Sequence, residues 1–344
     1  MRENELIRPE ELEPVTQNAV KILKELDKIL LGHQELHRMV LIGILSRGHI
    51  LLEGLPGVGK TALIKALGQL LQLDFNRVQF TPDLMPGDIL GANILQECGD
   101  GSREMVFHPG PVFTNILLAD EINRASPKTQ SAMLEAMQEA AVTLLGITRE
   151  LPSPFFVLAS QNPIELEGTY PIPEAQLDRF MFKLEVRTVD SAAMAEIISS
   201  RRRGQPPIPD WRLSKTELQE IFAVMERIFL PRAVSSYIAR LVEASHPGSR
   251  TALPEVNDYV SYGASPRAAI AMAEAARAAA LLRGRPAVGF GDVRDVAAAV
   301  LNHRLILNYK ARMDQMDSRR IIAVLLDKID AAGLELPEEI SLQQ

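Results

Sequence analysis

The octapeptide GLPGVGKT, residues 54–61, limits the possible folds of this chain more than any other stretch. It matches the pattern G-x-x-x-x-G-K-[ST], follows the apolar run HILLEG and precedes the helix-like run TALIKALGQLL. Glycines allow successive backbone N–H groups to turn toward a phosphate chain, and the helix that follows adds the positive end of its dipole. The alternative is a Gly-rich strand–helix turn with a chance Lys-Thr pair, but both the spacing and the context match the motif. The stretch therefore predicts a phosphate-binding loop in an α/β fold.

The residues of this loop have separate expected roles. Lys60 is expected to reach the β- and γ-phosphates of ATP, and the hydroxyl of Thr61 is expected to hold Mg²⁺. We expect the nucleotide to be held by the whole loop and the first helical turn, that is by Gly54, Leu55, Pro56, Gly57, Val58, Gly59, Lys60, Thr61 and Ala62.

Two adjacent acids, Asp120 and Glu121, end the apolar run NILLAD. Adjacent carboxylates repel, so on their own they fit a solvated strand end. In an open parallel sheet, however, ligands lie beyond the carboxyl ends of the strands, where the phosphate loop also lies. We therefore expect Asp120 to share the Mg²⁺ with Thr61, and Glu121 to polarise the attacking water. Arg124 follows three residues later, and the sequence leaves open whether it faces a subunit interface or forms a structural salt bridge.

Short apolar runs bounded by turn signals predict five buried strands, at residues 49–54, 76–80, 115–120, 155–160 and 182–186. Nearly continuous apolar character is typical of strands covered on both faces. Because helix-like stretches separate these runs, we expect a mostly parallel sheet between helices. Two inserts have the pattern of β-hairpins, one at about 90–110 with Asp100-Gly101 as its turn, and one at 142–151 with Gly146 at its bend.

The character of the chain changes near residue 201. We expect an ATPase core at 1–200, a Pro-rich linker at 201–213, a helical lid domain at 214–335 and a tail at 336–344. Strand signals fade after the linker. Ser214 and Glu217 have the spacing of a capping box, and Asp292 is a plausible N-cap for a helix that starts at Val293.

Composition excludes several classes of protein. The net charge of -7 argues against a duplex-DNA binder, whose domain usually carries a basic face. A single cysteine, Cys98, rules out a disulfide framework, and six scattered histidines without HExxH spacing argue against a zinc enzyme. The first residues lack an apolar signal core, and the most apolar long segment is broken by Glu274 and Arg277. We therefore expect a cytoplasmic protein without a transmembrane segment.

The phosphate loop together with the stretches LLADEINRASPKTQSAMLEAMQE and ASQNPIELEGTYPIPEAQLDRF resembles the MoxR group of AAA+ ATPases, within the clade that has an insert in helix 2. The resemblance runs from about residue 16 to 335. It implies an αβα sandwich with a five-stranded parallel sheet in the order 5-1-4-3-2, followed by an all-helical lid. It also implies ring oligomers, usually hexamers, with ATP held between subunits.

The resemblance implies further site residues. Asn162 would be sensor 1, which orients the lytic water, although an Asn-Pro turn also explains it. Arg179 would be the arginine finger that stabilises transition-state charge in the neighbouring subunit, although a surface pair with Asp178 is an alternative. Arg267 would be sensor 2, or else a solvated arginine; whether sensor 2 acts on its own site or the neighbour's stays open. The chain departs from the family at His33, where many members have Gln, in the segment that commonly contacts adenine.

The leading interpretation is an ATP-driven, chaperone-like machine that remodels, activates or matures protein partners. The resemblance implies partners that carry a von Willebrand factor A domain. A nucleic-acid motor of the same clade would need basic inserts, but the first insert carries Glu97, Asp100, Arg103 and Glu104. A chelatase-type ATPase subunit is another alternative, and the GTYPIPEAQLDRF stretch favours the MoxR group over it. A nucleotide switch that does not hydrolyse ATP would be expected to lack Glu121 or Arg179.

Overall fold

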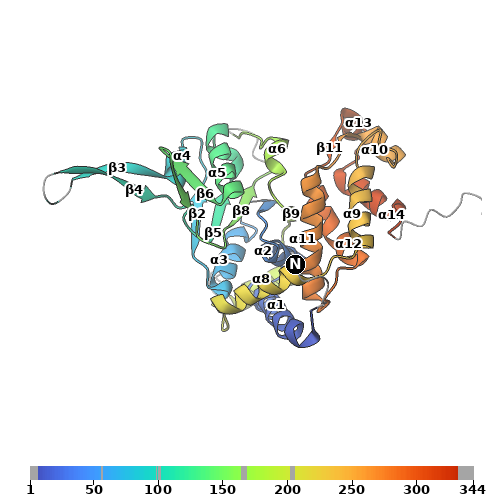
Figure 1. Cartoon of the computed structure of the whole chain (residues 1–344), viewed down its shortest axis with the longest axis horizontal. Helices are drawn as coiled ribbons and strands as arrows, with labels where there is room; N and C mark the ends of the chain where they lie inside the picture. The colour runs from blue at the N-terminus through green and yellow to red at the C-terminus, as the bar shows by residue number, and fades with distance from the viewer. Residues whose placement is uncertain are drawn as a thin grey trace, which may run out of the picture.

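The computed structural model describes residues 7–55, 57–97, 99, 102–163, 169–201 and 206–331 (Figure 1). Several features expected from the sequence lie outside these residues. They are Pro56 of the phosphate loop, Cys98, the Asp100-Gly101 turn, part of the linker and the tail at 336–344.

A five-stranded parallel sheet forms the centre of the core. Its strands are β2 (Phe75–Gln79), β5 (Ile116–Asp120), β8 (Phe156–Gln161), β1 (Ile50–Gly54) and β9 (Phe182–Val186), in that spatial order. Counted along the chain, this is the order 5-1-4-3-2, so the expected fold class is confirmed. Each observed strand overlaps one of the five apolar runs. The central strands β1, β5 and β8 are buried, because helices cover both faces of the sheet. The expectation of burial was wrong for β2, which lies at the edge of the sheet and has Val78 as its one buried residue.

Alternate residues of the three central strands β1, β5 and β8 enter two separate hydrophobic cores. Ile50 and Leu52 pack into the larger core, together with α1 (Pro9–Ile29), α2 (Gln34–Leu45) and α3 (Lys60–Leu71). Leu51, between them, packs on the other face of the sheet with α4 (Pro86–Leu90) and α5 (Pro127–Glu139). The sheet is therefore the middle layer of an αβα sandwich.

Two antiparallel hairpins extend from the second face. The first pairs β3 (Gly91–Glu97) with β4 (Arg103–Pro109) and projects far from the body of the molecule (Figure 1). The second pairs β6 (Ala141–Leu144) with β7 (Ile147–Glu150). The guanidinium carbon of Arg149 in the second hairpin lies 3.9 Å from the ring centre of Phe107 in the first, so a cation–π contact joins the two.

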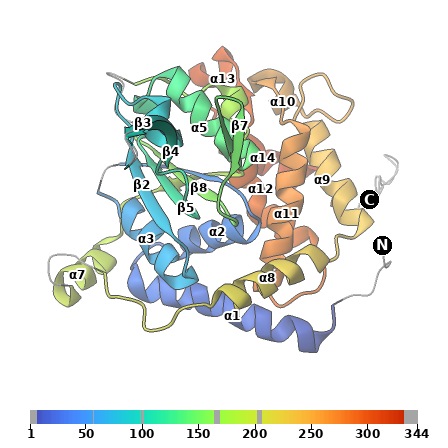
Figure 2. The same ribbon diagram turned by 60° about the vertical axis from the view of Figure 1, so that its left-hand side comes forward.

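The remaining core elements are short. They are the 3-10 helix η1 (Ile122–Arg124), α6 (Glu174–Leu177) and α7 (Ser191–Ser200). The helix α8 (Lys215–Arg227) then runs beside α1 along the lower edge of the molecule (Figure 2). It begins with the expected capping box, in which the Ser214 side chain accepts from the Glu217 N–H and the Glu217 carboxylate accepts from the Ser214 N–H.

The lid consists of helices apart from one small two-stranded sheet. Its helices are α9 (Arg232–Ala244), α10 (Pro254–Tyr259), α11 (Pro266–Leu282), α12 (Phe290–Leu301), α13 (Tyr309–Met313) and α14 (Ser318–Lys328). The pairing of β10 (Val260–Tyr262) with β11 (Ile306–Leu307) was not expected from the sequence. The prediction for Asp292 was wrong: α12 starts three residues earlier than expected, so Asp292 lies inside its first turn and accepts from the Gly289 N–H.

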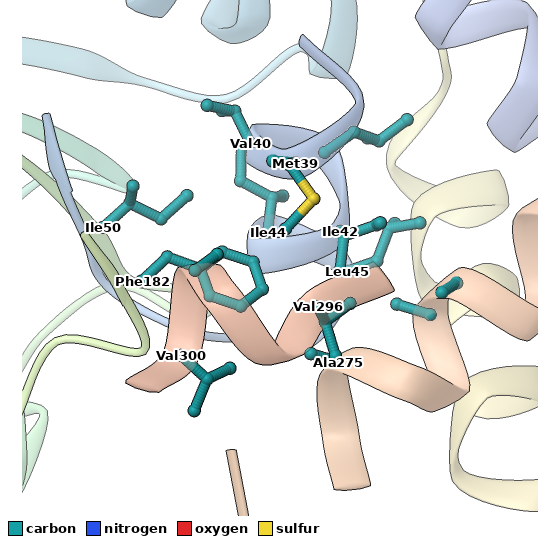
Figure 3. Packing of buried hydrophobic residues seen from close by; sticks show 14 of the residues in the cluster. Met39, Val40, Ile42, Ile44, Leu45, Ile50, Phe182, Ala275, Val296 and Val300 are labelled. Atoms are coloured by element: carbon teal, nitrogen blue, oxygen red, sulfur yellow. The ribbon is translucent and has the colours of Figure 1, made fainter. Parts of the chain in front are cut away.

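The lid and the core share one hydrophobic cluster. Helix α2 lies between the sheet and the lid, and its residues Met39, Ile42 and Leu45 belong to the same buried cluster as Val296 of α12 (Figure 3). Phe182, at the start of β9, extends this cluster into the sheet (Figure 3). None of the helices in the described part of the chain has the length and apolar character of a membrane span.

A buried histidine lies at the joint between lid and core. His303 follows α12, is only 8% exposed, and its Nε2 lies 3.0 Å from the carbonyl oxygen of Phe180. Because that oxygen can only accept, Nε2 carries a proton. Burial, reinforced by the positive charge of Arg304, lowers the pKa of His303 from 6.5 to about 3.

This shift predicts a stability loss in mild acid. The unfolded chain takes up a proton on His303 below about pH 6.5, whereas the folded chain does not until about pH 3. The stabilising contribution is therefore complete above pH 6.5 and is lost as the pH falls toward 3. Between pH 7 and pH 5 the loss should be about 2 kcal/mol in the free energy of unfolding.

Urea unfolding at pH 7 and pH 5 measures this effect. His303→Gln should reduce the pH dependence by about 2 kcal/mol, whatever it does to stability at pH 7. The control His108→Gln, on the exposed strand β4, should keep the full dependence. A full dependence in His303→Gln would contradict the assignment.

Candidate functional site

The carboxyl ends of β1, β5 and β8 form one edge of the sheet. In the parallel register, Ala119 of β5 pairs with Ala159 of β8, so Asp120 and Ser160 emerge side by side. Gln79 of β2 pairs with Asp120 on the other side. The phosphate loop follows β1 at the same edge. The fold therefore brings the expected loop and the expected acids together, as parallel topology requires.

The loop has the backbone conformation that its glycines permit. Gly57 and Gly59 have φ of 82° and 91°, in the left-handed region that side chains disfavour. Lys60 begins α3, is 8% exposed, and its Nζ donates to the Gly54 carbonyl at 2.7 Å. Burial lowers the pKa of Lys60, and the nearby Asp120 and Glu121 partly offset that by favouring its charge. An ammonium group is thus held inside the loop, close to both acids.

The Asp120 carboxylate is almost fully buried and has a partner on each oxygen. Oδ1 accepts from the Ser160 hydroxyl at 2.5 Å. Oδ2 accepts from Arg77, at 3.1 Å from Nε and 2.7 Å from Nη2. A cation from β2 therefore neutralises this carboxylate.

Glu121 is held in a strained backbone position. Its φ of 57° is left-handed, which is uncommon for a residue with a side chain and is typical of functional sites. Its N–H donates to Ser160 Oγ at 2.9 Å. Its Oε2 accepts from Gln79 Nε2 at 2.8 Å and from Arg124 Nη1 at 3.0 Å. The sequence left two alternatives for Arg124, a subunit interface and a structural salt bridge, and the structure contains the salt bridge, with Glu121.

The donor set suits magnesium bound with a nucleotide rather than a metal held by protein alone. Among the described residues, no cluster of three or more His, Cys, Asp or Glu side chains could hold a metal ion. Mg²⁺ is usually bound through one or two protein oxygens, with substrate phosphates and water completing its shell. Asp120 and the Thr61 hydroxyl at the first turn of α3 are the oxygens that could do this.

A cavity of about 270 Å³ adjoins the phosphate loop. Gly57, Val58, Gly59, Lys60 and Ala62 line it on one side. The opposite wall includes His33, whose Nε2 is buried and has no hydrogen-bond partner in the described chain. Burial lowers the pKa of His33, and the neighbouring His37 lowers it further, which favours a neutral ring. Apolar residues dominate the rest of the lining, as in pockets for a nucleotide base.

The other expected site residues lie in two places. Asn162 directly follows β8, 5% exposed, at the edge that carries the acids. Arg179 lies between α6 and β9, and its Nη1 donates to the Leu134 carbonyl of α5 at 2.8 Å. Arg267 is in the first turn of α11, and its Nη1 lies 3.7 Å from Oδ2 of Asp178. Arg179 and Arg267 line one cleft of about 310 Å³, and no residue of that cleft also lines the cavity at the phosphate loop.

Three side chains of the acid cluster were missed by the sequence analysis: Ser160, Arg77 and Gln79. Ser160 had a signal, because it is a polar residue at the end of an apolar strand. Arg77 and Gln79 are exposed alternate residues of the edge strand β2, which is an ordinary pattern. Only the pairing of β2 with β5 reveals that they face the acids.

Comparison with known proteins identifies the family. A model of the ATPase family associated with various cellular activities (AAA) matches residues 49–182, and a model of the AAA lid domain matches residues 254–324. Chaperone MoxR1 of Mycobacterium tuberculosis is 43% identical over 305 residues, which cover 89% of this chain and 80% of that protein. The chain belongs to the MoxR family of AAA+ ATPases.

Another MoxR-named protein and a solved structure are also similar to most of this chain. Protein MoxR of Methylorubrum extorquens is 31% identical over 324 residues, covering 89% of this chain and 93% of that protein. A crystal structure from Cytophaga hutchinsonii, of a protein provisionally described as an ATPase, has a TM-score of 0.85 and 39% identity. It covers 93% of this chain and 97% of that chain.

In this MoxR-family site, Arg77 and Mg²⁺ are expected to compete for Asp120. Arg77→Gln should lower the Mg²⁺ concentration needed for half-maximal binding of a fluorescent ADP analogue, by about two- to five-fold for a half-exposed charge pair. Arg187→Gln removes an exposed arginine that pairs with Glu185 instead, so it serves as the control. An unchanged or higher Mg²⁺ requirement in Arg77→Gln would contradict the competition.

Proposed function

We propose that this chain hydrolyses ATP with Mg²⁺ at sites shared between the subunits of a ring, and uses the energy to remodel protein partners. The observation that carries this proposal is the separation of two half-sites. Lys60, Asp120 and Glu121 gather at the carboxyl edge of the sheet, whereas Arg179 and Arg267 line another cleft. Neither half contains all the groups that phosphoryl transfer needs.

The length of β1 keeps the two half-sites of one subunit apart. The arginine cleft includes Gly48 and His49, which precede β1, and the phosphate loop follows its end. Five strand residues span about 16 Å, which exceeds the reach of an arginine side chain. Arg179 and Arg267 would therefore act on a neighbouring subunit, and sensor 2 would act in trans like the finger.

The residues of the carboxyl edge would divide the chemistry among them. Lys60 would bind the β- and γ-phosphates, and Mg²⁺ held by Thr61 and Asp120 would neutralise their charge. Glu121 would accept a hydrogen bond from the attacking water. Since Gln79 and Arg124 both hold Oε2, the other oxygen, Oε1, is the one we assign to the water. Asn162 would orient that water at the end of the neighbouring strand.

The ring and the partner are supported by the family and by the surface of the inserts. Members named chaperone occur among the relatives, as in Mycobacterium tuberculosis. Exposed apolar side chains cluster on the two hairpins, at Ile94, Leu95, Met105, Leu145 and Ile147. Such a surface suits protein contacts better than nucleic acid, which requires basic residues. We propose a hexameric ring and a partner with a von Willebrand factor A domain.

Mixing two inactive variants tests the shared site. Arg179→Ala should bind ATP but lose about 10³-fold or more in turnover, and Lys60→Ala should lose ATP binding. In a mixed ring, the intact site of an Arg179→Ala subunit can meet the intact finger of a Lys60→Ala subunit. Random assembly makes about one quarter of the interfaces complete, so ATPase activity should return. Assembled mixtures that stay inactive would refute trans action.

A trapped state tests the partner. Glu121→Gln should bind ATP without turning it over, which prolongs any complex that requires bound ATP. With ATP, it should retain a purified von Willebrand factor A domain protein from the same organism in size-exclusion chromatography, whereas Lys60→Ala should not. Retention of nucleic acid in place of the protein would refute the proposal and favour the motor alternative.

A further inference from the structure

The segment that carries the expected finger is held by the lid. Residues 178–181 join α6 to β9, and Arg179 is the second of them. Two consecutive lid residues after α12, His303 and Arg304, contact this segment from the other domain. The contact is separate from the nucleotide cavity, because neither lid residue lines it.

Every N–H of the Arg304 guanidinium has an acceptor. Nε donates to Asp178 Oδ1 at 2.7 Å. Nη1 donates to the Met181 and Val300 carbonyls at 3.0 and 2.6 Å. Nη2 donates to the Asp178 and Phe180 carbonyls at 3.1 and 2.7 Å. Four of these five acceptors belong to the finger segment.

This arrangement requires arginine. The Arg304 side chain is only 3% exposed, and a buried cation is tolerated only when its donors and charge are matched. Lysine has three donors without the planar fork, so it cannot serve five acceptors. His303 adds one more bond to the Phe180 carbonyl, at 3.0 Å. The carbonyls on both sides of Arg179 are thus fixed by the lid.

Asp178 connects the same segment to a second part of the lid. Its Oδ2 accepts from the Ser265 hydroxyl at 2.9 Å and lies 3.7 Å from Arg267 Nη1. One carboxylate therefore joins Arg304, Ser265 and Arg267 to the residue that precedes Arg179. The structure therefore has this network around Asp178 in place of the alternative, a surface pair between Asp178 and Arg179.

We propose that Arg304 is a positioning residue, which locks the finger segment to the lid through Asp178 so that Arg179 and Arg267 enter the neighbouring site as one unit. This rests on the proposed shared site. Arg304 acts through the backbone around Arg179 and does not line the cavity at the phosphate loop of its own subunit. A shift of the segment by about 1 Å would be enough to cost about 100-fold in turnover.

The mixing assay separates this role from a purely structural one. In one arm, Arg304→Lys is placed on the Lys60→Ala chain, whose finger serves the complete interface. In the other arm, it is placed on the Arg179→Ala chain, which contributes only the nucleotide site. Positioning predicts a loss of about 10- to 100-fold in the first arm, and less than about two-fold in the second. A structural role would reduce both arms equally.

A matched control and a second variant complete the experiment. Arg240 also donates to lid carbonyls, those of Asp330 and Ala331, but does not touch the finger segment, so Arg240→Lys should leave both arms unchanged.

If circular dichroism shows that Arg304→Lys does not fold, Asp178→Asn takes its place, because it keeps the oxygen for Arg304 and removes the charge. Equal losses in the two arms would overturn the inference alone. No activity in the parental mixture would overturn the shared site, and the inference with it.

Discussion

Parallel pairing of the five central strands is the constraint on which the rest of this structure depends. It brings the ends of β1, β5 and β8 to one edge, so that the phosphate loop and the acids of separate chain segments meet there. The same pairing brings the residues that precede the strands to the opposite edge, where Arg179 lies just before β9. The sheet therefore places the phosphate loop and the acids at one end of its strands and Arg179 at the other end, with about 16 Å of strand between them. If Arg179 and Arg267 take part in hydrolysis, as we propose, a second subunit must supply them.

Two kinds of interaction join the lid to the core. Apolar packing of α2 against the sheet and against α12 makes one continuous core (Figure 3). This packing holds the lid against the sheet, but apolar contacts have little directional preference. Directional bonds are concentrated at Asp178 and Arg304, next to the finger. Buried charge pairs contribute little net stability compared with apolar residues of the same shape, but they define geometry sharply. We infer that this polar joint serves orientation more than stability.

Short sequence patterns predicted most of those parts of the site that lie within one short segment of the chain. The loop around Lys60 and the strand that ends at Asp120 have short-range signals, since glycine spacing and apolar runs are read along the chain. Arg77 and Gln79 were missed because they meet the acids through strand register, which no short stretch encodes. Ser160 had a local signal at the end of its strand, but only the register shows that it lies beside Asp120. The Asp292 prediction failed because an acid near a helix start fits two positions, the N-cap itself and the third residue of the first turn, whose carboxylate accepts from the N-cap N–H. Arg304 has no local signal for this role, since four of its five acceptors lie more than 120 residues away.

Specific ATPase activity, measured as a function of protein concentration, shows whether hydrolysis needs more than one subunit. A site shared between subunits predicts that activity per subunit falls toward zero when dilution separates the subunits, in parallel with the loss of assemblies seen by analytical ultracentrifugation at the same concentrations. Binding of the fluorescent ADP analogue should persist in the separated subunits, because the loop, Lys60 and Asp120 belong to one chain. Full activity per subunit in a solution that contains only monomers would contradict a site shared between subunits.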